Sequence, residues 1–199
     1  MKKLGSIVMI AAAAMAFGAC KSNTTANSSS GTIDSTNVSK DSASKTTETA
    51  ASTMHVDKGD STFVVTAAND GMAEVAAGKM AQGKAVSTRV KNFASMMVTD
   101  HTQAGNELAA IAKTKNIALP SAPNADAQKM AADMDKMSGK DFDKDYVNGM
   151  VDGHEKAVKL FTDASQNLKD PDLKAFATKT LPTLKMHLDS IKAIKASMK

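Results

Sequence analysis

The segment 90–112, VKNFASMMVTDHTQAGNELAAIA, decides the fold of this chain. Its apolar residues recur every three or four positions, which is the spacing of one face of an α-helix. The pattern predicts a helix over about 87–115. One histidine, His101, shares the apolar face with the following residues: Val90, Phe93, Ala94, Met97, Ala104, Leu108, Ile111 and Ala112.

Three further segments show the same helical spacing of apolar residues. The predicted helices are 61–82, 141–168 and 172–198. We expect Asp60 or Ser61 to cap the first helix and Pro182 to kink the last. The chain has no tryptophan, one tyrosine and much Ala, Met and Lys, which favours helices over strands. The fold class predicted for residues 60–199 is therefore all-α, an antiparallel four-helix bundle.

The second and third long helices are separated by a longer connection. Pro120 and Pro123 interrupt the helical pattern over 116–124. A short extra helix follows, with Met130, Met134 and Met137 facing one way, and Ser138-Gly139 ends it. The other two connections are short turns, as expected between antiparallel neighbours.

A sequence repeat suggests that the bundle is built from two related halves. The pattern VKNFA at 90–94 recurs as LKAFA at 173–177. These stretches lie near the start of the second and of the fourth long helix. The repeat therefore predicts a duplicated helical hairpin.

The N-terminus has the organisation of a secretory signal. Met1-Lys2-Lys3 precedes an apolar run over 7–17, and Gly18-Ala19-Cys20 follows it. The apolar run is shorter than the roughly 20 residues of a membrane-spanning helix, so we expect cleavage of a signal peptide over 1–19. Cys20 is the single cysteine of the chain and ends a stretch that resembles a lipobox. We therefore predict lipidation of Cys20 and attachment to a membrane, with the outer membrane favoured because Lys21, and not aspartate, follows Cys20.

Residues 20–59 are predicted to be a flexible tether between the lipid and the bundle. The segment is rich in Ser and Thr and almost free of large apolar residues, so it cannot bury enough surface to fold. His55 lies in this tether, where a solvated histidine is expected. Removal of Lys2 and Lys3 lowers the formal charge from +4 to about +2. The remaining lysines alternate with aspartates, so nucleic acid is not an expected partner.

Three of the four histidines lie in the apolar faces of three different helices: His101, His154 and His187. The first helix places Glu74 in its own apolar face. Imidazole and carboxylate groups that project inward from separate helices are the usual ligands of metal sites in helical bundles. The expected cofactor is one transition-metal ion, bound by these four residues.

The heights of these side chains along the bundle can be compared by counting from the turns. His154 and His187 are almost equally far from the turn near Asp170, so they are expected to face each other. Glu74 and His101 differ by roughly 7–8 Å in height when they are counted from the turn near residue 85. Asp70 fits the level of His101 better, whereas Glu74 has the longer side chain. We favour Glu74 and keep Asp70 as the alternative.

The same histidines are also compatible with a bundle that holds no metal. Each histidine could be a core residue that is hydrogen-bonded to a neighbour, or the four polar residues could form a structural network that fixes the packing of the bundle. Met97 and Met150 each stand four residues before a histidine, which is the spacing of a soft copper(I) site. Core packing is the simpler interpretation of these methionines.

The following stretches resemble a bacterial family named domain of unknown function 4142: GMAEV at 71–75, VKNFA at 90–94, Met97-Val98, Asp100-His101, Phe142-Asp143, Tyr146, Met150-Val151, His154-Glu155, Phe176-Ala177, Leu181-Pro182 and His187-Leu188. The resemblance implies an exported or outer-membrane protein with a ferritin-like bundle, without a settled activity. It also singles out Glu74, His101, His154 and His187.

Ferritin-like iron oxidases use Glu-x-x-His motifs on two helices, and this sequence contains none. We therefore expect a single-metal site, or a relic of one, with no catalytic residue assigned. The alternative is a metal-free helical module that serves a structural role or interacts with other envelope proteins.

Overall fold

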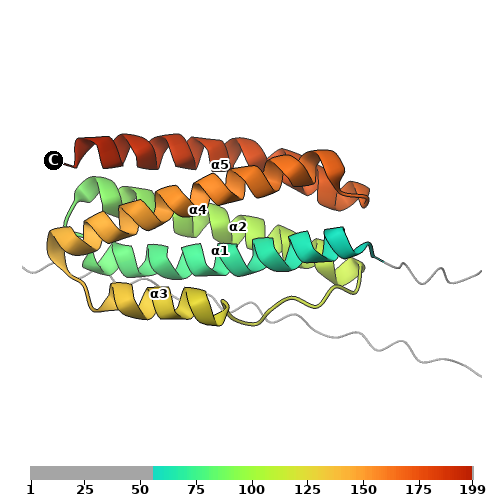
Figure 1. Cartoon of the computed structure of the whole chain (residues 1–199), viewed down its shortest axis with the longest axis horizontal. Coiled ribbons are helices and arrows are strands. Elements are labelled where there is room, and N and C mark those ends of the chain that lie inside the picture. The colour runs from blue at the N-terminus through green and yellow to red at the C-terminus, as the bar shows by residue number, and fades with distance from the viewer. Residues whose placement is uncertain (1–55, 199) are drawn as a thin grey trace, which may run out of the picture. The chain divides into compact units, whose positions relative to one another are not determined.

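The computed structural model describes residues 56–198 and shows an all-helical domain, with no strand in that range (Figure 1). Its helices are α1 (Lys58–Lys84), α2 (Thr88–Thr114), α3 (Ala125–Asp135), α4 (Gly139–Asn167) and α5 (Pro171–Ser197). The predicted fold class is confirmed, including the short extra helix α3. None of these helices is long and apolar enough to cross a membrane. The predicted signal peptide, Cys20, His55 and nearly all of the tether lie outside the described residues.

The helix boundaries follow from capping side chains. Asp57 accepts a hydrogen bond from the backbone N–H of Gly59, so α1 begins at Lys58, three residues earlier than predicted. Asp170 accepts from the N–H groups of Asp172 and Leu173, and Pro171 occupies the first position of α5. Both aspartates satisfy N–H groups that have no partner inside the helix. α5 continues through Pro182 without interruption.

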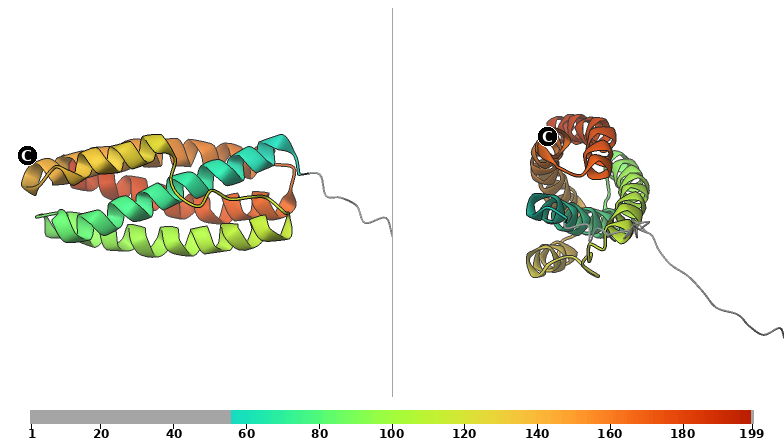
Figure 2. Two further views of the ribbon diagram at one scale, coloured as in Figure 1. Left: turned by 90° about the horizontal axis from the view of Figure 1, so that it is seen from below. Right: turned by 90° about the vertical axis from the view of Figure 1, so that its right-hand side faces the viewer.

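The long helices form two hairpins, α1–α2 and α4–α5, that pack against each other with α1 on α4 and α2 on α5. The crossover from α2 to α4 carries α3, which lies outside the bundle beside α1 (Figure 2). Asp60, in the first turn of α1, accepts hydrogen bonds from the N–H groups of Lys169 and Asp170 between α4 and α5. The start of α1 therefore lies at the end of α4.

The opposite end of the bundle is joined in the same way. Asp143, near the start of α4, accepts hydrogen bonds from the N–H groups of Val86 and Ser87 between α1 and α2. At the α4–α5 turn, the end that Asp60 joins, Lys115 just after α2 also pairs with Asp170 and Asp172 at 2.6 and 2.7 Å, which joins the end of α2 to the start of α5. Neighbouring helices of the bundle are therefore antiparallel, as predicted.

The two hairpins are related in three dimensions as well as in sequence. Asp60 and Asp143 are each 2% exposed, and each binds the turn of the other hairpin. They are separated in sequence by the same distance as Val90 and Leu173, the first residues of the repeated pattern. The same separation relates the ring pair Phe63–Phe176, at 6.5 Å, to the pair Tyr146–Phe93, at 6.4 Å. These equivalent contacts support the predicted duplication of a helical hairpin.

The apolar core consists of two clusters along the bundle axis. One surrounds Phe93 and Tyr146 near the α1–α2 turn, and the other surrounds Phe63 and Phe176 near the α4–α5 turn. Met97 and Met150 are buried in the first cluster, as expected of core residues.

The three methionines predicted to face one way from the short helix differ in burial. Met134 is 7% exposed, and Met137, just after α3, packs on the first core cluster. Met130, however, is 63% exposed. α3 lies on the outside of the bundle, where its main contacts are with α1 and, more weakly, with α4.

Candidate metal centre

The interior of the bundle brings together His101 of α2, His154 of α4 and His187 of α5. Their ring centroids are 5.4–5.6 Å apart, and the three side chains are at most 9% exposed. Each ring offers one nitrogen such that the three nitrogens lie within 4.8 Å of one another. The three histidines therefore form one buried cluster, which we call the histidine triad.

The three histidines lie at the same height along the bundle axis because of the directions of their helices. α4 and α5 are antiparallel, and His154 and His187 lie at similar distances from the turn that joins them, as the sequence predicts. α2 and α4 run parallel on opposite corners of the bundle. His101 and His154 stand at comparable distances from the starts of these two helices.

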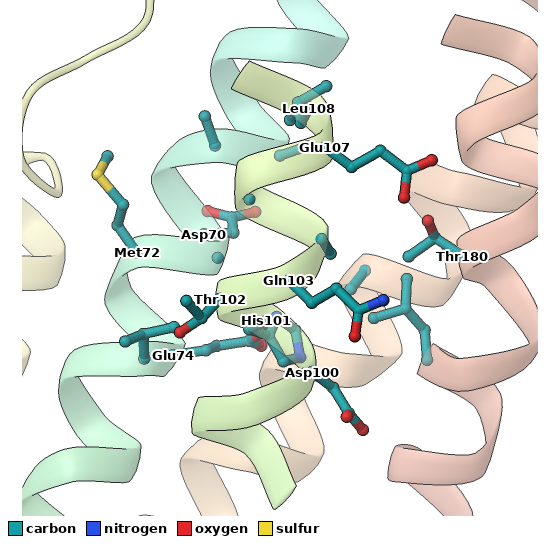
Figure 3. Close-up of a pocket in the computed structure, with 18 of the residues that line it drawn as sticks. Asp70, Met72, Glu74, Asp100, His101, Thr102, Gln103, Glu107, Leu108 and Thr180 are labelled. Atoms are coloured by element: carbon teal, nitrogen blue, oxygen red, sulfur yellow. The ribbon is translucent and has the colours of Figure 1, made fainter. Parts of the chain in front are cut away.

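Glu74 of α1 lies beside the triad, as Figure 3 shows for its contact with His101. Glu74 Oε2 is 3.0 Å from His101 Nδ1, and Glu74 Oε1 is 3.5 Å from His154 Nδ1. Asp70, the alternative from helix counting, instead accepts a hydrogen bond from the Asn69 side chain.

The height difference calculated for Glu74 and His101 is closed by the tilt of their side chains. Side chains in a helix lean toward its N-terminus. Glu74 therefore leans away from the α1–α2 turn, whereas His101 leans toward it. Because the two helices are antiparallel, these tilts bring the carboxylate and the imidazole to the same level.

The outer nitrogen of each triad ring faces an oxygen atom. His101 Nδ1 lies 3.0 Å from Glu74 Oε2. His154 Nδ1–H donates to the carbonyl oxygen of Met150, and His187 Nε2–H donates to Asp100 Oδ2, both at 2.9 Å. The carbonyl of Met150 and the carboxylate of Asp100 place the ring protons of His154 and His187 on those nitrogens, because both oxygens require a donor. For His101, the ionised form of Glu74 favours the proton on Nδ1.

The second nitrogen of each ring is buried and has no hydrogen-bond partner among the described residues: His101 Nε2, His154 Nε2 and His187 Nδ1. In the assigned tautomers these nitrogens carry lone pairs and no proton. Buried polar atoms nearly always find a partner. Three such atoms in one cluster are therefore unusual for a helical core.

Asp100 is the residue that sequence patterns did not assign to the site. It precedes His101 on α2 and is rotated by about 100° around the helix, toward α5. There its carboxylate meets His187, while its side chain remains 31% exposed. The sequence does show an acidic residue next to His101. Only the packing of α2 on α5 shows that this residue, Asp100, binds His187 and not its neighbour His101.

Burial changes the protonation of the site. Burial, together with the neighbouring imidazoles, lowers the pKa of His101 to about 3 and that of His154 to about 4. Burial, with the charge of Asp70, raises the pKa of Glu74 to about 8. The two imidazoles are therefore neutral at pH 7, which is the form that binds metal ions.

Gly153 on α4 provides the space for the Glu74 carboxylate. A Cβ atom at this position would lie 3.1 Å from Glu74 Oε1. Any larger residue would therefore crowd the carboxylate. Tyr146, deeper in the core, has a buried hydroxyl without a described partner, and its pKa is raised by burial and by Glu74.

A pocket of about 630 Å³ extends along α2, between α1 on one side and α5 on the other (Figure 3). His101, His187 and Glu74 form part of its wall. Asp70 also lies on this wall and faces the pocket from α1. The triad is therefore next to a hollow that opens to the surface.

Comparisons with known proteins identify a family and a related fold. The family model described as Domain of unknown function (DUF4142) matches residues 45–194. The comparison with curated proteins found no match. A solved structure described as a DUF305 fragment from Deinococcus radiodurans aligns with 71% of this chain and 97% of the fragment. Its TM-score is 0.62 at 9% sequence identity, so the likeness concerns the fold alone.

Proposed function

This chain belongs to the DUF4142 family, and we propose that its helical domain binds one transition-metal ion through His101 Nε2, His154 Nε2 and His187 Nδ1. The observation that carries the proposal is the set of three buried nitrogens without partners in one cluster. A metal ion would use all three lone pairs at once. A purely structural hydrogen-bond network would instead leave them unsatisfied.

The acceptors around the triad also support a metal site. Histidine ligands of metals usually donate their other N–H group to a carboxylate or a backbone carbonyl, which fixes the tautomer and the ring orientation. All three triad rings have such an acceptor: Glu74, the carbonyl of Met150, and Asp100. Glu74 is then an orienting residue for His101 and not itself a ligand.

The geometry requires only a small contraction. A tetrahedral ion with nitrogen ligands at 2.0–2.1 Å separates those nitrogens by about 3.3 Å. One nitrogen of each ring lies within 4.8 Å of the corresponding nitrogens of the other two, so side-chain shifts of about 1.5 Å or less are sufficient. A set of three neutral imidazoles suits zinc and the neighbouring divalent ions cobalt, nickel and copper(II).

Metal analysis of the tag-free protein tests this proposal. We expect one zinc or cobalt ion per chain after loading and desalting, and a strong loss in His101→Gln and His154→Gln. His55→Gln is the matched control, because His55 precedes the first described helix in the sequence and is not one of the proposed ligands. Circular dichroism verifies that each variant is folded. Equal metal content in all four proteins, or no metal in any of them, would contradict the proposal and favour the metal-free helical module.

We also propose that lipid on Cys20 anchors this domain to the cell envelope, with the outer membrane favoured. The proposal rests on the signal-like sequence of residues 1–20 and on the Ser/Thr-rich segment that follows. Expression of the full chain with an alkyne-labelled fatty acid tests it. The label and the membrane association should both disappear in Cys20→Ser, and unchanged membrane association in that variant would exclude the lipid anchor.

A further inference from the structure

We infer that the metal ion keeps one coordination position open toward the pocket along α2, and that this position binds a small ligand with one donor atom on a flat, uncharged apolar group. The inference rests on the metal site proposed above. It adds the chemical class of the ligand. It also distinguishes a metal site that exchanges a ligand with the solvent from a structural site in which the protein fills every coordination position.

The protein supplies three ligands and no fourth among the described residues. Each of α2, α4 and α5 contributes one imidazole to the triad. The fourth helix, α1, contributes Glu74, but its carboxylate contacts the Nδ1 atoms of His101 and His154, which are the outer nitrogens of those rings. Zinc sites with three protein ligands typically keep a fourth position for water or substrate.

One side of the triad is closed by the core. The Phe93 ring lies 6.4 Å from His154 and 6.3 Å from His187, measured between ring centroids. Phe93 is 3% exposed and packs edge-on against Tyr146 at 6.4 Å. These rings fill the bundle on the side of the α1–α2 turn, so a ligand has no space there.

The other side of the triad adjoins the pocket. His101 and His187 form part of its wall, and the pocket continues past Phe161 and Phe176 toward the α4–α5 turn. Its volume of about 630 Å³ is within the range of small-molecule sites. A ligand that reaches the metal from this side therefore extends along the bundle axis, away from Phe93.

The walls of the pocket determine the class of ligand. They are mainly apolar near the triad: Ala67, Ala104, Leu108, Ala157, Phe161 and Leu184. Lys179 and Glu107 also line the pocket, but the ammonium donates to both carboxylate oxygens at 2.8–2.9 Å, so these two charges neutralise each other. The apolar lining favours an uncharged body, the carboxylates of Asp70 and Asp100 on the wall disfavour an anion, and aromatic rings favour a flat group.

Titration of the cobalt-loaded protein with imidazole and with 4-phenylimidazole tests the inference. Both compounds offer the same donor atom, and only the second carries an apolar ring. We expect both to shift the visible spectrum of cobalt(II), with 4-phenylimidazole binding about tenfold or more tightly because its phenyl ring is buried. Metal analysis after the titration verifies that cobalt is still bound.

Two variants of α2 locate the phenyl group. Ala104→Leu fills the pocket and should remove most of the advantage of 4-phenylimidazole without changing imidazole binding. Ala110→Leu is the matched control, because Ala110 is exposed on the same helix and does not line the pocket. It should leave both affinities unchanged.

The outcomes separate the two proposals. A cobalt spectrum that responds to neither compound would overturn the open position while the metal site stands. Equal affinities of the two compounds, or equal effects of the two alanine variants, would overturn the apolar ligand class. Failure of the wild-type domain to retain cobalt or zinc would contradict the metal site itself.

Discussion

At the scale of single residues, the site depends on groups that orient the histidines as much as on the histidines themselves. Asp100 is the clearest case, because it is half-exposed and holds the one triad ring whose inner nitrogen is Nδ1. Loss of such an acceptor leaves the imidazole present but free to rotate and to change tautomer.

Asp100→Ala should weaken metal binding by about 10- to 100-fold, the range observed when the acceptor of a ligating histidine is removed. Competition with a chromophoric chelator measures the affinity. Asp189→Ala, at an exposed position of the same helix as His187, is the control and should bind metal normally. An unchanged affinity in Asp100→Ala would show that the carboxylate does not orient His187.

The stability of the metal-free domain should pass through a maximum near pH 6.5. Between pH 4.5 and 8 folded Glu74 keeps a proton that the unfolded chain has released, so its contribution falls as the pH rises. Below pH 6.5 the unfolded chain binds protons on His101 and His154 that the folded chain, with pKa values of about 3 and 4, does not bind. Below pH 6.5 the unfolded chain therefore binds more protons on the two histidines than the folded chain binds on Glu74. The free energy of unfolding consequently also falls as the pH decreases.

Urea unfolding in the presence of a chelator at pH 5, 6.5 and 8 measures this dependence. Each proton difference corresponds to about 1.4 kcal/mol per pH unit. The variant Glu74→Gln should lose the decline above pH 6.5 and keep the acid decline. If the decline above pH 6.5 persists in Glu74→Gln, another group causes it.

At the scale of the elements, the contacts between helices are made by a few residues of special shape or charge. Gly78 of α1 faces α2 so closely that a Cβ atom would lie 2.9 Å from Val98 Cγ2 and 3.2 Å from the carbonyl oxygen of Ala94. Gly71 of the same helix has no atom within 4 Å of its Cβ position. Gly78 is therefore required for the close approach of α1 to α2, whereas the space around Gly71 would accommodate a side chain.

Gly78→Ala should destabilise the domain by about 1–3 kcal/mol, the cost of overpacking. Gly71→Ala should stabilise the domain by about 0.5–1 kcal/mol. Alanine has less backbone freedom than glycine in the unfolded chain, so it loses less conformational entropy when the helix forms. Chemical denaturation of both variants provides the comparison. Equal changes in the two variants would mean that helix propensity, and not the close approach of α1 to α2, determines the result.

Asp143→Ala should destabilise the bundle by about 3 kcal/mol, because it leaves the N–H groups of Val86 and Ser87 without their charged acceptor. Asp152→Ala, exposed on the same helix, is the control for loss of negative charge and should change stability little. Thermal unfolding reports the difference. A small effect of Asp143→Ala would indicate that water replaces the carboxylate.

The elements were largely predictable from the sequence, because the spacing of apolar residues in a helix is a local property. Four helices, the extra helix and the shared level of His154 and His187 follow from counting along the chain. Asp60 shows the limit of that approach. As a residue before an apolar run it resembles a cap of its own helix, but its partners are Lys169 and Asp170, which are distant in sequence.

At the scale of the whole molecule, the parts of the site that escaped prediction are those created by packing. The choice between Asp70 and Glu74 depends on opposite side-chain tilts in two antiparallel helices, and the role of Asp100 depends on the α2–α5 contact. The pocket depends on all four long helices, which together leave a hollow beside the triad. No single segment of sequence contains that information.

If the triad binds metal only in the folded domain, metal should stabilise the whole bundle. At a free zinc concentration 100 times the dissociation constant, the gain in unfolding free energy is about 2.7 kcal/mol. Differential scanning calorimetry with zinc and with a chelator measures it. The shift in melting temperature should be absent in His187→Gln and present in His55→Gln.

The uneven division of the triad between the two hairpins has a consequence for biogenesis. The hairpin α1–α2 holds one imidazole of the triad and α4–α5 holds two, and His187 lies in the last of the described helices. No triad can exist until that helix is made and docked. If the chain is exported unfolded and binds a metal ion, as proposed above, it would cross the membrane without the ion and would acquire it only after folding, in the compartment where the protein resides.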